Sequence, residues 1–214
     1  MLREWVTAKE GRSVTSGRGT SLLDLVFALA LIGIVAALGV ARLERAIADV
    51  RETGAARAFA SRIRQVRAEA VRLSNAVGLQ FVLTGSLAQF RAYADGNGNG
   101  LRTREISAGV DPPIAPPETL ADATGAVRFG LDGALPEVSD TDGAGPSGSS
   151  AAGSADPLRL GSSNLLTFGA TGSGSSGTIY LRGPTRQFAV RVYGTTGRIR
   201  LLEFDRASRA WVER

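Results

Sequence analysis

The fold is decided by residues 20–42, which read TSLLDLVFALALIGIVAALGVAR. From Leu22 to Val40 this stretch is apolar except for a single acid, Asp24. About 20 apolar residues in a helix match the roughly 30 Å hydrocarbon core of a bilayer. Residues 1–19 are polar and contain four basic side chains, which favours keeping that side in the cytoplasm. We therefore expect a membrane-spanning helix over residues 20–42.

The apolar pattern changes after this stretch but stays helical. Apolar residues recur every three or four positions as far as Leu73, with charged residues between them, and no proline interrupts residues 20–75. This spacing predicts that the helix continues over residues 43–75 as an amphipathic segment. We expect that segment to place one apolar stripe on a globular domain.

Residues 76–214 have the pattern of a β-rich domain. Short runs of β-forming residues alternate with turn residues, and they predict strands at 77–84, 89–94, 126–129, 165–168, 178–181, 187–193, 198–204 and 211–212. Residues 139–156 are mostly Gly, Ser, Ala and Asp, which predicts a flexible loop. The expected class is α+β, with a long N-terminal helix, membrane-spanning in its first half, packed on antiparallel β-sheets.

The composition argues against an enzyme and against a bound cofactor. The chain has no Cys and no His, so it lacks the thiol nucleophile, the usual general base and the commonest metal ligand. The charge is uneven, because residues 181–214 hold eight Arg against three acids. Any binding of an anionic partner is therefore expected at this C-terminal end.

The boundary before the apolar stretch resembles the N-terminus of type IV pilins and pseudopilins. The resemblance lies in residues 19–25, GTSLLDL, which run into the apolar residues 30–37. It implies a leader of residues 1–19 that prepilin peptidase removes after Gly19, and methylation of the new first residue, Thr20. It also implies that Asp24 pairs with the α-amino group of a neighbouring subunit. Most relatives have Phe in place of Thr20 and Glu in place of Asp24.

Residues 67–73 followed by residues 77–81 look like the minor pseudopilin H and FimT-like group of this family. The resemblance implies a pilin-like fold and a structural subunit either of a type II secretion pseudopilus, where it takes part in protein export, or of a type IV pilus tip. It also implies a single-pass protein of the bacterial inner membrane with a periplasmic C-terminal domain. The implied partners are other pilin-like subunits, prepilin peptidase and the inner membrane.

An alternative function is DNA binding by a basic hairpin. If residues 194–197 form a turn, alternation places Arg191, Tyr193, Arg198 and Arg200 on one face, with Arg191 opposite Arg200. Such a face offers cations for phosphates and a ring for base stacking. Residues 197–200, GRIR, also resemble the Gly-Arg-x-Arg element of FimT-like pilins that take up DNA. The simpler interpretation is a solvated strand face with acids nearby, such as Glu203 or Asp205.

A second candidate site is the loop DGNGNG at residues 95–100. Asp95, Asn97 and Asn99 place oxygen-bearing side chains at alternate positions, as in a calcium loop, and Glu105 follows. A loop of that kind needs its bidentate Glu one residue later, where Ile106 stands. We therefore favour a tight Gly/Asn turn and expect no metal.

Overall fold

The computed structural model describes residues 21–84, 87–120, 126–138 and 156–214. The chain divides into two compact units, Met1–Glu44 and Arg45–Arg214, which we describe separately. The predicted flexible loop lies outside the described residues except for its last residue, Asp156.

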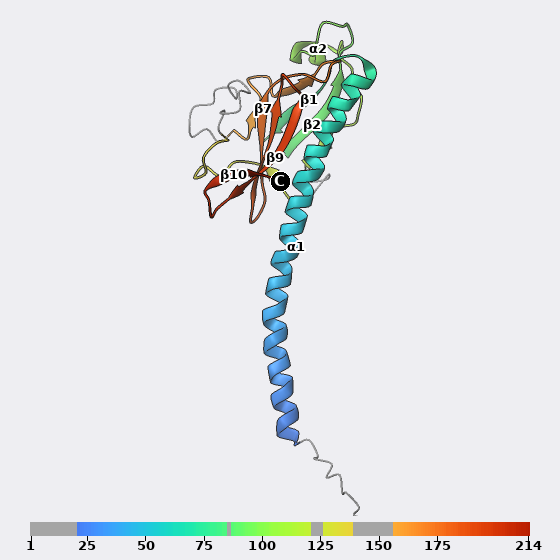
Figure 1. Cartoon of the computed structure of the whole chain (residues 1–214). Helices are drawn as coiled ribbons and strands as arrows, with labels where there is room; N and C mark the ends of the chain where they lie inside the picture. Colours follow the sequence, from blue (N-terminus) through green and yellow to red (C-terminus); the bar gives the residue numbers. More distant parts are fainter. Residues whose placement is uncertain (1–20, 85–86, 121–125, 139–155) are drawn as a thin grey trace, which may run out of the picture. The chain divides into compact units, whose positions relative to one another are not determined.

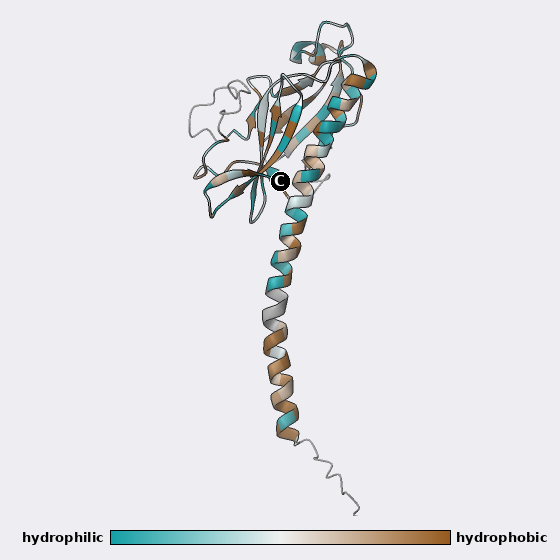
Figure 2. Ribbon diagram, in the orientation of Figure 1, coloured by the Kyte–Doolittle hydropathy of each residue, from teal (hydrophilic) through white to brown (hydrophobic). Residues whose placement is uncertain are grey.

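Helix α1 (Leu22–Leu73) begins in the first unit (Figure 1). Ser21 caps its start, because the Ser21 hydroxyl accepts a hydrogen bond from the Leu23 N–H at 3.3 Å. Asp24 lies in the first turn, where a negative charge interacts favourably with the helix dipole. Every described side chain from residue 22 to residue 36 is exposed in this unit. Figure 2 shows that this stretch is mostly hydrophobic.

The second unit contains two antiparallel sheets. The first sheet has the order β3-β2-β1-β6 and the second has the order β10-β9-β8-β7-β4, with β5 also paired to β7. The strands of the first sheet are β1 (Val77–Thr84), β2 (Leu87–Ala94), β3 (Glu118–Thr119) and β6 (Leu165–Phe168). Those of the second are β4 (Arg128–Phe129), β5 (Leu158–Arg159), β7 (Gly177–Arg182), β8 (Gln187–Tyr193), β9 (Arg198–Asp205) and β10 (Ala210–Glu213). A short helix, α2 (Thr103–Ala108), follows β2.

One hydrophobic core joins residues 55–70 of α1 with residues of both sheets. Its centre is a cluster of four phenylalanine rings in edge-on or tilted contact, with centroids 5.5–6.5 Å apart. The rings are those of Phe59, Phe81, Phe90 and Phe129. Ala56 and Ala60 are fully buried beside Phe59, and their small side chains let the helix backbone come close to the strands.

The second sheet is covered on both faces. On one face of β8, Phe188, Val190 and Val192 belong to the main core, and on the other face Ala189 belongs to a smaller cluster with Tyr180 and Leu202. Residues 131–138 cover this second face, and the Val138 N–H donates to the Tyr180 hydroxyl at 3.0 Å. The sheet therefore has no wet face over β7 and β8, although antiparallel sheets commonly have one.

Two expectations from the sequence are wrong. The fold is mostly β, with two antiparallel sheets, and it is not the α+β, pilin-like class with a membrane-spanning first half that we expected. Across the described residues, no helix combines the length and the apolar content needed to cross a membrane, which contradicts a single-pass inner-membrane protein. The fold-class expectation gave the helix too much weight, because most elements of the described chain are strands, and these pair into two sheets.

Candidate functional site

The first candidate site is the apolar start of α1. Ten large hydrophobic side chains between Leu22 and Val35 are 55–80% exposed. Consecutive residues of an α-helix point about 100° apart. Most of these exposed side chains have an exposed neighbour in the sequence, so they occur on all sides of the helix. Asp24 is the one acid among residues 22–36. The predicted cleavage and methylation positions, Gly19 and Thr20, lie outside the described residues.

The second candidate site is the hairpin formed by β8 and β9. Its register is as predicted: Arg191 pairs with Arg200, Tyr193 pairs with Arg198, and the Gly197 N–H donates to the Tyr193 carbonyl at 2.7 Å to close the turn. Val190 and Val192 point into the core, again as predicted. The strands therefore bring the four predicted residues to one face of the hairpin.

The four residues do not, however, form an open basic surface. Arg191 is only 1% exposed, and its Nη1 donates to the Thr178 hydroxyl of β7 at 2.7 Å while its guanidinium lies 5.8 Å from the Tyr193 ring centroid. The second face of the sheet is covered, so a residue expected at the surface is inside. Sequence alternation separates two faces but does not show whether both are buried.

An acid on β10 lies against the exposed part of this face and balances one of its two positive charges. The Glu213 carboxylate accepts hydrogen bonds from the Arg200 Nε at 2.8 Å and Nη2 at 2.5 Å, and it lies 3.7 Å from the Arg198 Nη2. These contacts, together with the Tyr193 hydroxyl, raise the pKa of Arg200 above its ordinary value. We expected a nearby acid from the sequence, but as Glu203 or Asp205. Strand β10 supplies it instead, because β10 pairs with β9.

The glycine of the GRIR element has a structural reason. Gly197 has a φ of 63°, a left-handed conformation that favours glycine, and a Cβ there would lie 1.9 Å from the Gly172 carbonyl oxygen. The Arg67 Nε of α1 donates to that same carbonyl at 2.9 Å, and its Nη2 lies 3.4 Å from the Thr196 carbonyl oxygen. Arg67 therefore joins the β6–β7 loop and the β8–β9 turn to the helix.

The Asp/Asn loop is held together by its own hydrogen bonds. The Asp95 carboxylate accepts the N–H groups of Asn97 at 3.0 Å, Gly98 at 2.8 Å and Gly100 at 2.6 Å. Burial on its own raises the pKa of Asp95, but these N–H groups outweigh burial and lower the pKa below its usual value. Asn99 donates to Glu105 at 3.0 Å. The geometry is that of a tight turn, and no group of three or more acidic side chains suited to a metal ion occurs within the described residues.

A third cluster was missed by the sequence reasoning. Glu52 of α1 is 1% exposed, and its carboxylate accepts the N–H groups of Thr185 at 3.2 Å and Arg186 at 2.9 Å and the Thr185 hydroxyl at 2.9 Å. Asp49, one helical turn earlier, accepts from the Arg186 guanidinium at 3.0 Å, and Arg186 also binds Glu203. The bond to Asp49 is the main reason that the pKa of Arg186 is raised. We call Asp49, Glu52 and Arg186 the turn clamp.

The sequence does carry a signal for the turn clamp. Residues 49, 52, 56, 59 and 63 follow the three-and-four spacing of the buried helix stripe, so both acids continue the face that holds Phe59 and Ile63. An acid at such a position must have partners, because burying an unpaired charge is costly. The partners are N–H groups and an arginine of the β7–β8 turn, which is 133–137 residues away in sequence and therefore not visible as a local pattern.

Neither a model of a known protein family, nor a curated protein, nor a solved structure matches this chain.

Proposed function

We propose that this chain is a non-enzymatic structural subunit of a filament, of the minor pseudopilin kind, and that it takes part in protein export. The observation that carries the proposal is the exposed apolar start of α1, where ten large hydrophobic side chains have no cover in their own unit. Burying one such side chain is worth about 1.5–3 kcal/mol, so the free helix has a strong tendency to find partners.

The exposure on all sides favours a filament over a simple dimer. A helix that is apolar all round is normally buried all round, whereas a helix that pairs with one partner needs a single apolar stripe. Equivalent helices of neighbouring subunits, packed around this one, supply cover on every side. A repeated contact between different surfaces of identical or similar subunits produces an open helical assembly when it does not close into a ring.

Asp24 gives this assembly a specific contact. Within a bundle of apolar helices the Asp24 carboxylate needs a positive partner, since an unpaired buried charge is costly. The resemblance to pilins suggests the α-amino group of Thr20 in the next subunit, formed by cleavage after Gly19. Asp24 also stabilises α1 itself, because an acid in the first turn interacts favourably with the helix dipole. The test therefore has to separate an effect on assembly from an effect on helix formation.

The experiment uses the absence of cysteine from the full chain. Leu29 and Leu31 point about 200° apart on the helix, so a Leu29→Cys/Leu31→Cys variant carries one thiol on each side. Mild oxidation is expected to give a ladder of covalent multimers on a denaturing gel. The control pair Ser61→Cys/Ser107→Cys places two exposed thiols in the second unit and is expected to stay monomeric.

Two further readouts separate the proposal from its competitors. Asp24→Ala is expected to shorten the ladder while Asp24→Glu keeps it, because only the second keeps a carboxylate. Mass spectrometry of the protein purified from its own cells is expected to find Thr20 as a methylated first residue. Dimers alone, or an intact Met1 together with a ladder that ignores Asp24, would contradict the proposal.

A further inference from the structure

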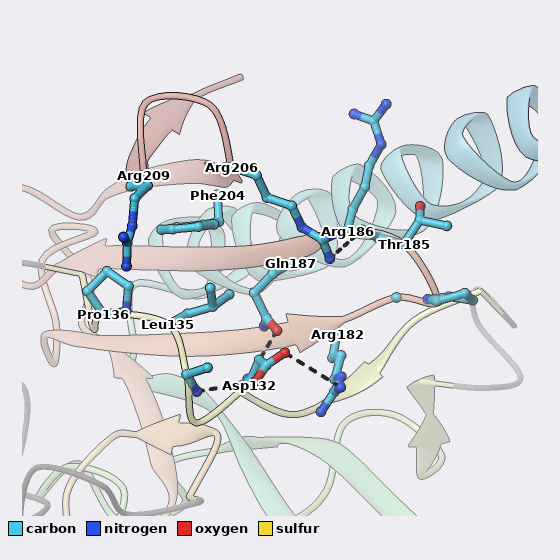
Figure 3. Close-up of a pocket in the computed structure, with 13 residues that line it drawn as sticks. Asp132, Leu135, Pro136, Arg182, Thr185, Arg186, Gln187, Phe204, Arg206 and Arg209 are labelled. Atoms are coloured by element: carbon cyan, nitrogen blue, oxygen red, sulfur yellow. Dashed lines mark hydrogen bonds and ion pairs between the residues drawn. The ribbon is translucent and has the colours of Figure 1, made fainter.

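A cleft of about 300 Å³ lies in the second unit, next to the turn clamp. It is formed by the β7–β8 turn, the turn after β9 at residues 206–209, and residues 132–136 (Figure 3). Phe204, Leu135 and Pro136 give it an apolar part, and Arg182, Arg206 and Arg209 give it a basic rim.

Two arginines of this rim differ from the other arginines of the C-terminal segment in having no described acidic partner. Of the eight arginines in residues 181–214, Arg191 is buried, and five others lie within 4 Å of an acid. Those five are Arg182, Arg186, Arg198, Arg200 and Arg214. The remaining two, Arg206 and Arg209, have no ion pair with any described acidic residue, and both line the cleft. These two arginines of the basic C-terminal end therefore lie at the cleft without a described acidic partner.

The turn that carries these two arginines is held in a defined conformation. The Asp205 carboxylate accepts the N–H groups of Ala207 at 3.1 Å and Ser208 at 3.2 Å and the Ser208 hydroxyl at 2.7 Å. Arg206 reaches one wall, where its Nη2 donates to the Thr185 carbonyl at 3.2 Å. Figure 3 shows Arg209 directed toward Pro136 on the other side of Phe204. Two positive charges thus stand on either side of an aromatic ring.

We propose that this cleft binds an acidic peptide segment of a partner protein. One or two carboxylates of the segment pair with Arg206 and Arg209, and an apolar side chain of the segment packs on Phe204, Leu135 and Pro136. Arginine forms strong, often bidentate, hydrogen bonds with carboxylates. The apolar part distinguishes this cleft from a nucleic-acid surface, which follows the phosphate backbone with an extended row of cations. The proposal does not depend on the filament.

Trp211 provides a direct readout of the cleft. Its ring centroid lies 5.4 Å from that of Phe204, and its Nε1 donates to the Pro136 carbonyl at 2.9 Å, so it touches two residues of the cleft. The chain has one other tryptophan, Trp5. In a Trp5→Phe background, the fluorescence of Trp211 alone reports on binding.

The probe is a synthetic peptide of alternating Glu and Leu, ten residues long, added to the full chain. We expect a saturable change in Trp211 fluorescence, with a Kd that rises with salt. Arg206→Gln/Arg209→Gln is expected to weaken binding about tenfold or more. The matched control Arg64→Gln/Arg104→Gln removes the same charge from two exposed residues elsewhere and is expected to change the Kd less than about twofold.

A second peptide and a second variant test whether binding depends on the carboxylates of the peptide and on the positive charge at positions 206 and 209. The same peptide with Gln in place of Glu is expected to bind at least about tenfold more weakly, and Arg206→Lys/Arg209→Lys is expected to recover part of the affinity. Unchanged far-ultraviolet circular dichroism shows that each variant is folded. The proposal is overturned if the Gln peptide binds equally well, if the double Gln variant binds like the native chain, or if a 20-nucleotide single-stranded DNA depends on Arg206 and Arg209 while the acidic peptide does not.

Discussion

The turn clamp predicts a strong coupling between Gly183 and Glu52. A Cβ built on Gly183 would lie 2.1 Å from the Glu52 Oε2, and its three nearest atoms all belong to that side chain. The Gly183→Ala variant must therefore displace the Glu52 carboxylate from its three donors on Thr185 and Arg186. Hydrogen bonds to a charged group contribute about 1.5–3 kcal/mol each, and water can replace those to the exposed Thr185. We expect a loss of about 2–3 kcal/mol.

The Glu52→Ala variant loses the same bonds and also leaves a gap, so we expect a loss of about 2–4 kcal/mol. In that background the Gly183→Ala change no longer meets the Glu52 carboxylate and is expected to cost less than about 0.5 kcal/mol more. The double-mutant cycle then gives a coupling of about 2 kcal/mol. Urea unfolding of the full chain carrying Trp5→Phe, followed by circular dichroism and by Trp211 fluorescence, measures each free energy of unfolding.

The control for this cycle is Gly133→Ala, because no heavy atom lies within 4 Å of a Cβ at that position. We expect it to change stability by less than about 0.5 kcal/mol in either background. Additive effects of Gly183→Ala and Glu52→Ala would refute the close contact between the β7–β8 turn and the helix. A Gly183→Ala variant as stable as the native chain would refute it as well.

Three further predictions concern the other sites. Asp95→Ala is expected to destabilise the chain by about 2 kcal/mol with or without calcium, since three N–H groups lose their acceptor; thermal unfolding that depends on calcium would contradict this. Because the folded pKa of Asp95 is lowered, its contribution is fully present above the unfolded value of about 3.9 and is lost as the pH falls through the folded pKa, so native and variant stabilities should converge in acid. A gel shift of the full chain with DNA is expected to be weak at physiological salt and little affected by Arg198→Ala/Arg200→Ala, because both arginines already lie against the Glu213 carboxylate, which competes with phosphate; a shift that the double variant abolishes would favour the DNA-uptake alternative. Gly197→Ala is expected to cost about 3 kcal/mol in urea unfolding, through its left-handed backbone and its contact with Gly172, and a neutral result would contradict that contact.

The sheets follow closely from the sequence where local rules decide. Strands β1, β6 and β8 have the boundaries predicted from alternation and flanking turn residues, and the β8–β9 register follows from the four-residue turn. The two-residue strands β3 and β5 were not predicted, since two residues carry no period. The number of sheets could not be predicted from local patterns either, because it depends on pairings such as that of β1 with β6, about 85 residues apart.

The candidate sites were predictable as residues but not as surfaces. The sequence places Arg191 and Arg200 opposite each other, but whether that face meets water depends on residues 131–138, which follow no regular pattern. The Asp95 turn was predictable because its bonds are formed within six residues. The acidic partner Glu213 and the unpaired Arg206 and Arg209 were not, because charge pairing between elements is a property of the assembled sheet.

Glu52 and Arg67 together have a mechanical consequence. They lie 15 residues apart on the same helix, about 22 Å. Glu52 holds the β7–β8 turn, whereas Arg67 holds the β6–β7 loop and the β8–β9 turn at the opposite ends of β7 and β8. A pulling force along the helix axis would act on the Glu52 and Arg67 contacts at the same time, as a shear force, and would not break them one after the other. The part of α1 between Glu52 and Arg67 should therefore resist sliding and twisting against the strands until both sets of contacts break. Until then, the sheets should move together with the helix when it is pulled.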